Sequence, residues 1–305
     1  MTGAAGFIGS HTVEKFLASS HEVVGLDNLS SGKYDNLSAC FSSNAFDFVN
    51  LDLCSNFDCL NKLFKRYLPD AVVHLAALVS VRESVISPMD CYHNNVKATQ
   101  NTLEACRING IKKIVVASSA SVYGDANDFP LNEDTVTRPS NPYAASKVCC
   151  ESLLEAYSKT YQINGTVLRY FNVYGPRQAS DSEYSGVISI FVKRLMEDRS
   201  LLVFGDGTQS RDFIHVDDVS TVNLKAILSS DSGYQVYNVC TGNECSINDL
   251  VKMIKEASGK DVLVENYTSE NPGVRRSVGD NLRFAKHLGF TQRHTLEHYI
   301  NSINL

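Results

Sequence analysis

A glycine-rich turn followed by a helix, a strand and an acid constrains the fold of this chain more than any other feature. Thr2–Gly9 contains glycines at positions 3, 6 and 9. They allow a tight turn and a close backbone approach to a pyrophosphate at a helix N-terminus. A helix over Ser10–Ala18 and an apolar strand over Val23–Asp27 follow. Asp27 lies about 20 residues after the glycines, where a carboxylate accepts hydrogen bonds from adenosine ribose hydroxyls and repels a 2′-phosphate. The order predicts a dinucleotide site that favours NAD over NADP.

Apolar strands then alternate with helical stretches. The expected strands are Val23–Asp27, Ala71–Leu75, Ile114–Ser118 and Gly165–Arg169, and the helices include Asn56–Tyr67 and Asn95–Asn109. This alternation predicts an α/β fold, a doubly wound parallel sheet with helices on both faces. After residue 170 the regularity ends, and short helices over Ser185–Asp198 and Ser246–Ala257 indicate a smaller C-terminal lobe. We therefore expect residues 1–170 to form a Rossmann-like NAD-binding domain and residues 171–305 to form mainly a substrate-binding lobe.

Two further segments carry candidate catalytic residues. Tyr143 and Lys147 are four residues apart, so on a helix they share one face. An ammonium beside a phenol favours the phenolate, which makes Tyr143 a candidate base near neutral pH. Ser119 ends an apolar strand, where ligands bind in doubly wound sheets. Taken alone, Tyr-x-x-x-Lys also fits an ordinary amphipathic turn, and the serines fit a plain strand-to-loop cluster.

Composition excludes several classes of protein. The net charge of −6 over 305 residues argues against a nucleic-acid surface. The nine cysteines and eight histidines show no metal-ligand spacing, so no metal site is predicted. The odd cysteine count and the lack of a signal peptide favour reduced thiols in the cytoplasm. No apolar run is long enough to span a membrane.

Together with these features, several long strings resemble one family. They are His74–Ala77, Leu168–Arg177 and Phe204–Val216. The chain resembles the extended short-chain dehydrogenase/reductase family of NAD-dependent epimerases and dehydratases, and within it the nucleotide-sugar 4-epimerases. The resemblance covers nearly the whole chain. It implies that a later segment, about 212–240, returns to the first domain, and that two helices, 95–109 and the one bearing Tyr143, form a homodimer.

The resemblance also implies roles for individual residues. Catalysis would fall to Ser119, Tyr143 and Lys147. NAD would contact Gly3, Gly6, Phe7, Ile8, Gly9, Asp27, Asn28, Asp52, Leu53, Ala76, Ala77, Asn95, Tyr143, Lys147 and Phe171. A UDP-sugar would contact Ser119, Ser121, Asn172, Phe204, Arg211, Arg275 and Ser277.

The implied reaction is a transient oxidation at sugar C4. A 4,6-dehydratase of the same family needs an acid and a base beside the serine, but Ala120 and Ser121 stand there. Relatives that act on UDP-glucuronate often carry Thr where Asn172 stands, so Asn172 favours neutral UDP-hexoses. An inactive relative, or an NAD(H) sensor, is the alternative to an enzyme.

The C-terminal region bears on the substrate. Ser277 matches a position that is Tyr in enzymes restricted to UDP-glucose and UDP-galactose and small in those that admit N-acetylhexosamines. The expected products are therefore UDP-GlcNAc/UDP-GalNAc as well as, or instead of, UDP-glucose/UDP-galactose. The family's Arg-Pro-Gly-Asp reads Asn271–Val274 here, so the diphosphate-binding Arg is replaced by Asn, and either Arg275 or Arg276 would have to substitute.

Only Met1 and Thr2 precede Gly3, although a βαβ unit needs a strand before its glycine turn. Losing about five buried apolar side chains forfeits on the order of 8–15 kcal/mol, comparable to the stability of a whole domain. Two hypotheses follow: translation starts upstream, or the chain is a truncated and weakened relative.

Overall fold

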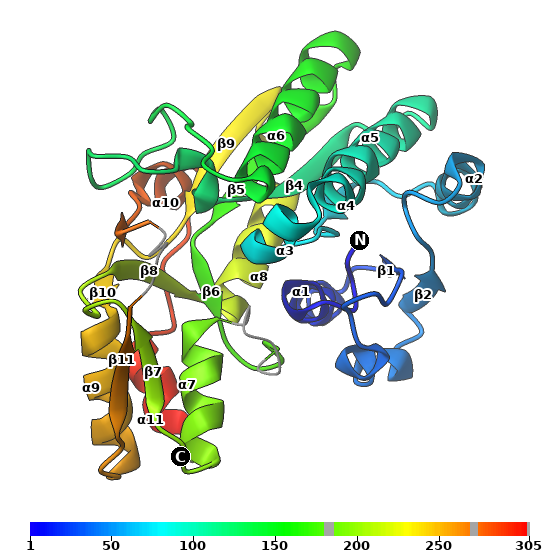
Figure 1. Ribbon diagram of the computed structural model, residues 1–305. Coiled ribbons are helices and arrows are strands. Elements are labelled where there is room, and N and C mark those ends of the chain that lie inside the picture. Colours follow the sequence, from blue (N-terminus) through cyan, green and yellow to red (C-terminus); the bar gives the residue numbers. More distant parts are fainter. Residues whose placement is uncertain (180–185, 269–273, 304–305) are drawn as a thin grey trace.

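The computed structural model describes residues 1–179, 186–268 and 274–303. The predicted helix start at Ser185 and the departure at Asn271–Gly273 lie outside these residues. Figure 1 shows two lobes, with a large sheet flanked by helices in one and short strands with α7, α9 and α11 in the other.

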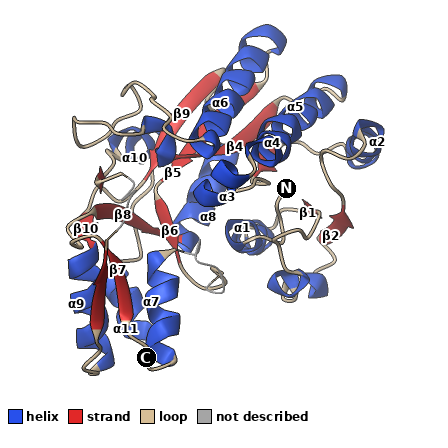
Figure 2. Ribbon diagram, in the orientation of Figure 1, coloured by secondary structure: helices blue, strands red, loops and turns tan. Residues whose placement is uncertain are grey.

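Parallel strands form the centre of the larger lobe (Figure 2). They are β1 (Val23–Asp27), β2 (Phe46–Asn50), β3 (Val72–His74), β4 (Lys113–Ser119), β5 (Asn164–Tyr170) and β9 (Tyr234–Val239). β1 pairs with β2, and the other four are ordered β3-β4-β5-β9. Thr2 joins the two groups through single-residue parallel bridges to Leu26 and His74. The parallel sheet confirms the predicted α/β fold.

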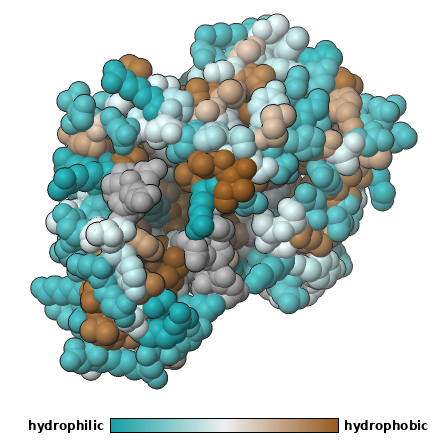
Figure 3. Space-filling view, viewed as in Figure 1, coloured by the Kyte–Doolittle hydropathy of each residue, from teal (hydrophilic) through white to brown (hydrophobic). Residues whose placement is uncertain are grey.

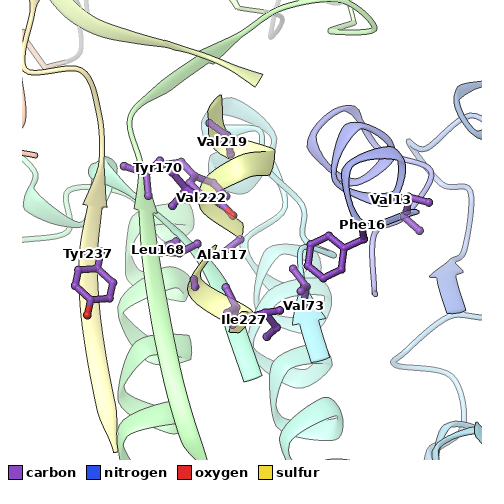
Figure 4. Close-up of a cluster of buried hydrophobic side chains, with 14 of the residues drawn as sticks. Val13, Phe16, Val73, Ala117, Leu168, Tyr170, Val219, Val222, Ile227 and Tyr237 are labelled. Atoms are coloured by element: carbon purple, nitrogen blue, oxygen red, sulfur yellow. The ribbon is translucent and has the colours of Figure 1, made fainter. Parts of the chain in front are cut away.

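Helices cover both faces of this sheet. One face carries α1 (Phe7–Ala18), α8 (Val216–Leu228) and α10 (Leu282–Leu288), and the other carries α2 (Phe57–Tyr67), α5 (Ala98–Ile108) and α6 (Pro142–Tyr161). Figure 4 shows the core of the first face, where Phe16 of α1 and Val219 and Val222 of α8 lie beside strand side chains such as Val73 and Leu168. Strands buried on both faces explain their continuous apolar sequences.

The smaller lobe has its own core. Its elements are β6 (Asn172–Tyr174), α7 (Val187–Met196), β7 (Leu201–Phe204), β8 (Ser210–His215), β10 (Glu244–Ser246), α9 (Ile247–Ser258), β11 (Val264–Tyr267), β12 (Arg276–Ser277) and α11 (Leu296–Ser302). β8 pairs in parallel with β6 and β12 and antiparallel with β10. Phe191, Leu250 and Ile300 are buried among these elements.

Short helical elements lie in the connections between these strands and helices. They are η1 (Tyr34–Leu37), η2 (Cys40–Ser42), α3 (Val81–Ile86), α4 (Pro88–Tyr92), the π-helical turn η3 (His93–Lys97) and η4 (Ala120–Tyr123). Figure 3 shows apolar side chains gathered over α3, whose Val85 and Ile86 are exposed. No helix among the described residues has the length and apolarity needed to cross a bilayer.

The predicted strands agree with the observed ones to within one residue at each end. α1 begins at Phe7 rather than Ser10, because Gly6 has the extended backbone of an N-cap. β9 and α8 belong to the larger lobe, and α10 also packs there through Phe284 and Leu288. The assignment of the two lobes to NAD and to substrate stays a prediction.

Candidate active site

A cavity of about 650 Å³ opens at the carboxyl ends of β1, β3, β4 and β5. This edge is where ligands bind in doubly wound sheets. Most of the predicted cofactor and catalytic residues line it: Gly3, Gly6, Phe7, Ile8, Gly9, Asp27, Asn28, Asp52, Leu53, Ala76, Ala77, Ser119, Tyr143, Lys147 and Phe171.

The glycine turn is shaped for close backbone approach. Gly3 has φ +66°, and a Cβ there would lie 2.7 Å from the Ala76 nitrogen. A Cβ on Gly9 would lie 1.9 Å from the Gly3 carbonyl oxygen. α1 begins beside this turn with no side-chain cap and no acid in its first turn, so its free N–H groups and positive dipole end suit an anion. The residues present therefore fit the pyrophosphate of a dinucleotide.

Asp27 closes the turn from the end of β1. Its Oδ2 accepts a hydrogen bond from the Ala5 amide at 2.9 Å, and its Oδ1 accepts one from the Leu29 amide at 2.8 Å. Each carboxylate oxygen has a second lone pair for a ribose hydroxyl. Asp52 is held in a similar way, because its Oδ1 accepts from the Cys54 amide at 2.7 Å.

Tyr143 and Lys147 lie on the face of α6 that is turned toward β4. Asn141 caps the helix by accepting from the Ala144 amide, and Pro142 occupies its first turn. Lys147 Nζ donates to the Ala117 carbonyl at 3.0 Å and lies 5.8 Å from the centre of the Tyr143 ring. Ser119, two residues after Ala117, lines the same cavity. Both α6 side chains are buried, with 8% and 5% of their surfaces exposed, so little water reaches them.

Sequence reasoning missed Glu151, which lies one turn beyond Lys147. The Glu151 carboxylate accepts from the Ser118 hydroxyl at 2.5 Å and from two Arg169 nitrogens at 2.7 and 3.0 Å. Arg169 also donates to the Tyr123 hydroxyl at 3.0 Å. The network ties α6 to β4 and β5 beside the predicted catalytic residues. The sequence does indicate this residue, because Tyr143, Lys147 and Glu151 are spaced four residues apart and so share one helix face.

Asn95 lies behind the cavity wall rather than on it. This buried residue accepts from the Leu78 amide at 2.7 Å, and its amide nitrogen donates to the Leu78 carbonyl and the Ser146 hydroxyl. It thereby fastens the loop after β3, which includes Ala76 and Ala77, to α6. Its predicted contact with the cofactor stays a prediction.

Several predicted substrate residues lie outside the cavity lining, in and beside the smaller lobe. Ser277 of β12 is the parallel register partner of Arg211 in β8. Arg211 Nη1 donates to the Ser210 carbonyl at 2.7 Å, and burial lowers the pKa of its guanidinium. Asn172 donates to the Asp212 carbonyl at 3.3 Å, and the Phe204 ring is 59% exposed.

Ser121 and Arg275 are the remaining predicted substrate residues, and Arg276 is the alternative to Arg275 as a diphosphate ligand. Ser121 carries a buried hydroxyl with no hydrogen-bond partner among the described residues. Arg276 is held by Glu244 at 2.7 Å and lies over the Phe129 ring, so a diphosphate would have to displace Glu244 from it. Arg275 is exposed and forms no ion pair within the described part of the chain.

The sequence profile of the NAD dependent epimerase/dehydratase family matches residues 1–240. The chain belongs to this family. A UDP-glucose 4-epimerase from Mycolicibacterium smegmatis is 40% identical over 291 residues, covering 95% of this chain and 92% of the relative.

Two solved structures of the family are similar over nearly the whole chain. A UDP-N-acetylglucosamine 4-epimerase from Methanobrevibacter ruminantium, in complex with UDP-N-acetylmuramic acid, is 35% identical with a TM-score of 0.92, covering 98% of this chain and 94% of that one. A UDP-glucuronic acid 4-epimerase from Bacillus cereus, with UDP-glucuronic acid and NAD, is 32% identical with a TM-score of 0.89, covering 99% and 96%. The chain is therefore an epimerase of the UDP-sugar 4-epimerase group, whose members differ in their sugars.

Proposed function

We propose that this epimerase interconverts UDP-GlcNAc and UDP-GalNAc, UDP-glucose and UDP-galactose, or both pairs, with NAD bound at the cavity of the larger lobe. The observation that carries the proposal is the meeting of Ser119 from β4 with Tyr143 and Lys147 from α6 at the wall of one cavity. The cavity begins at the glycine turn, which supports a dinucleotide as its other occupant.

Three side chains have separate roles in the reaction at C4 of the sugar. When bound, NAD supplies a reversible hydride acceptor. Tyr143 takes the proton of the 4-hydroxyl and returns it to the 4-keto sugar after the sugar has turned over. Lys147 is held by the Ala117 carbonyl beside the Tyr143 ring, where its charge balances the negative charge that develops on the Tyr143 oxygen during proton transfer. Ser119 hydrogen-bonds the sugar O4 and keeps it within reach of Tyr143.

Dehydration is the rival chemistry within the family. It requires an acid and a base beside Ser119 to remove water from the sugar. η4 places Ala120 and Ser121 directly after Ser119, and neither can supply a carboxylate. This supports epimerisation over a 4,6-dehydratase reaction.

The neighbourhood of Arg211 supports an N-acetylated substrate. The planar Arg211 fork suits the diphosphate, and the short Ser277 side chain stands next to it in the sheet. Arg275 is the better substitute for the missing diphosphate-binding arginine, because Glu244 occupies Arg276. Asn172 favours neutral hexoses over UDP-glucuronate.

We also propose a homodimer through α5 and α6.

The test is turnover by the full chain supplemented with NAD, followed by proton NMR with UDP-GalNAc, UDP-galactose and UDP-glucuronate in parallel. The proposal predicts conversion of UDP-GalNAc to UDP-GlcNAc and no conversion of UDP-glucuronate. Conversion of UDP-glucuronate alone would overturn the choice of sugar while keeping the epimerase.

A further inference from the structure

A second cavity, of about 260 Å³, shares no lining residue with the first. It is lined by Pro176, His215, His294, Thr295, His298, Tyr299 and Ser302. His215 ends β8, Asp217 lies in the first turn of α8, and His294 precedes α11. The fold brings these three together from distant parts of the sequence, with one nitrogen or oxygen of each within 4.8 Å of the others.

Hydrogen bonds indicate which ring nitrogens of this group can act as acceptors. The Asp217 amide donates to His215 Nδ1 at 3.2 Å in an N-cap bond of α8, so Nδ1 carries a lone pair that is engaged in this bond, and not the proton. His294 Nδ1 bonds the Asp218 carboxylate at 3.1 Å. That carboxylate can only accept, so His294 Nδ1 carries the proton and the lone pair of the neutral ring is on Nε2.

Both ring nitrogens lie near one carboxylate oxygen. Asp217 Oδ2 lies 3.8 Å from His215 Nδ1 and 4.0 Å from His294 Nε2. The other oxygen, Oδ1, bonds His11 Nδ1 of α1 at 3.1 Å. Two ring nitrogens and a carboxylate oxygen therefore lie together, and an ion bound through His215 Nδ1 would replace the bond from the Asp217 amide.

We propose that His215, Asp217 and His294 bind a divalent transition-metal ion of the zinc type. Two imidazoles and one carboxylate form a common zinc ligand set, with the remaining position open. With bonds of about 2.1 Å, two ligands can be at most ~4.2 Å apart. In the tetrahedral arrangement of zinc the ligand atoms lie about 3.4 Å apart. The separations of 3.8 and 4.0 Å from Oδ2 would therefore shorten by roughly 0.5 Å, and the two nitrogens would approach one another by up to about 1.4 Å. The stacked His215 and His294 rings, 4.5 Å apart, would turn slightly as the ion enters.

The surroundings support the ligands. Asp218, only 1% exposed, orients His294 in the manner of a carboxylate behind a metal-bound histidine. His294 and Asp217 are partly exposed, which gives an ion access to the buried His215. The bound ion would clamp the segment before α11 onto α8 and, through His11, onto the helix of the glycine turn.

The experiment titrates the chelator-stripped full chain with zinc ions by calorimetry, without nucleotide or sugar. The matched variants are Asp217→Asn and His294→Gln. The control is His21→Gln, because His21 follows the C-terminal end of α1 and is not part of this cluster. We expect one zinc ion per chain, at least about 100-fold weaker affinity in both site variants, and a smaller loss of ~10–100-fold in Asp218→Asn. His21→Gln should bind as the parent does.

Cobalt(II) absorption separates this site from the cysteines, because thiolate ligation produces a charge-transfer band that histidine and carboxylate ligands lack. No thiolate band should appear. Absent zinc binding, binding that both site variants retain, or a thiolate band would overturn the proposal. Melting of each variant in chelator establishes that it is folded, so a loss of binding cannot be confused with unfolding.

Discussion

Glu151 and Arg169 form a bidentate ion pair inside the protein, with each side chain only 7% exposed. The pair links α6, which carries Tyr143 and Lys147, to β5, and through the Ser118 hydroxyl to β4. Removing one partner of such a pair leaves a buried charge without compensation, which is strongly destabilising.

Glu151→Gln should therefore lower the free energy of unfolding by about 3 kcal/mol or more. Glu155→Gln is the matched control, because Glu155 pairs with Lys159 one turn later on the exposed side of the same helix. Its change should stay within ~0.5 kcal/mol. Urea unfolding followed by circular dichroism measures both. Equal effects of the two variants would mean that the buried pair does not hold α6 in place.

Tyr143→Phe removes the hydroxyl that exchanges the proton while keeping the ring that lines the cavity. We expect kcat to fall by about 10²–10⁴, with KM and NAD affinity nearly unchanged. Steady-state kinetics measures kcat and KM, and NADH fluorescence measures binding of the cofactor. Turnover that survives this substitution would assign the proton transfer to another group.

Ser277→Tyr should discriminate between sugars. A large ring beside Arg211 leaves less room for an N-acetyl group, and the crowding is expected to cost about 1–3 kcal/mol. The kcat/KM for UDP-GalNAc should fall by ~5–150-fold relative to that for UDP-galactose. A parallel decline for both sugars would place Ser277 away from the acetyl group.

Gly9→Ala should disrupt the glycine turn, because its Cβ would lie 1.9 Å from the Gly3 carbonyl oxygen. Gly6→Ala is the graded control, since its Cβ would lie 3.3 Å from the same oxygen and its φ of −74° suits alanine. NAD titration should show binding abolished in the first variant and only weakened in the second. Normal NAD binding by Gly9→Ala would contradict the assignment of the turn to the pyrophosphate.

His74 gives a prediction for pH. Burial, and secondarily the charge of Lys147, lower the pKa of His74 from 6.5 to about 3. Below pH 6.5 the His74 imidazole therefore binds a proton in the unfolded chain, whereas in the folded chain it stays neutral until the pH falls toward 3. The stability contributed by neutral His74 is complete above pH 6.5 and is lost as pH falls toward 3, at up to ~1.4 kcal/mol per pH unit.

His74→Gln should accordingly be less sensitive to acid than the parent. Urea unfolding at pH 7 and pH 5 measures the difference. Gln is chosen because it keeps groups that can bond the hydroxyls of Thr2 and Thr99, as His74 does. An equal loss of stability in both proteins would show that His74 is accessible to protons in the fold.

Local patterns predicted most of the larger lobe. Glycine spacing, strand alternation and the four-residue spacing of Tyr143 and Lys147 each depend on neighbours in sequence, so these parts of the cavity lining could be anticipated. Other lining residues, such as Asp52 and Phe171, are implied only by the family resemblance. Asn95 shows the limit, because its amide could equally face a cofactor or the protein, and packing against Leu78 and Ser146 decides where it lies.

The features that the sequence could not predict depend on pairings between distant segments. Arg211 and Ser277 become neighbours only because β12 adds to β8 in parallel. His215 and His294 meet through the packing of α11 against β8, which no histidine spacing reveals.

The most direct test of the proposed chemistry follows deuterium at C4 of the sugar. Labelled UDP-GalNAc and UDP-galactose are incubated with the chain and NAD, and the products are examined by NMR. Oxidation and return at C4 predict the inverted 4-hydroxyl with deuterium still on C4. Deuterium found at C6 would indicate a dehydratase, deuterium lost to water would indicate carbanion chemistry, and unchanged substrates would contradict the 4-epimerase assignment.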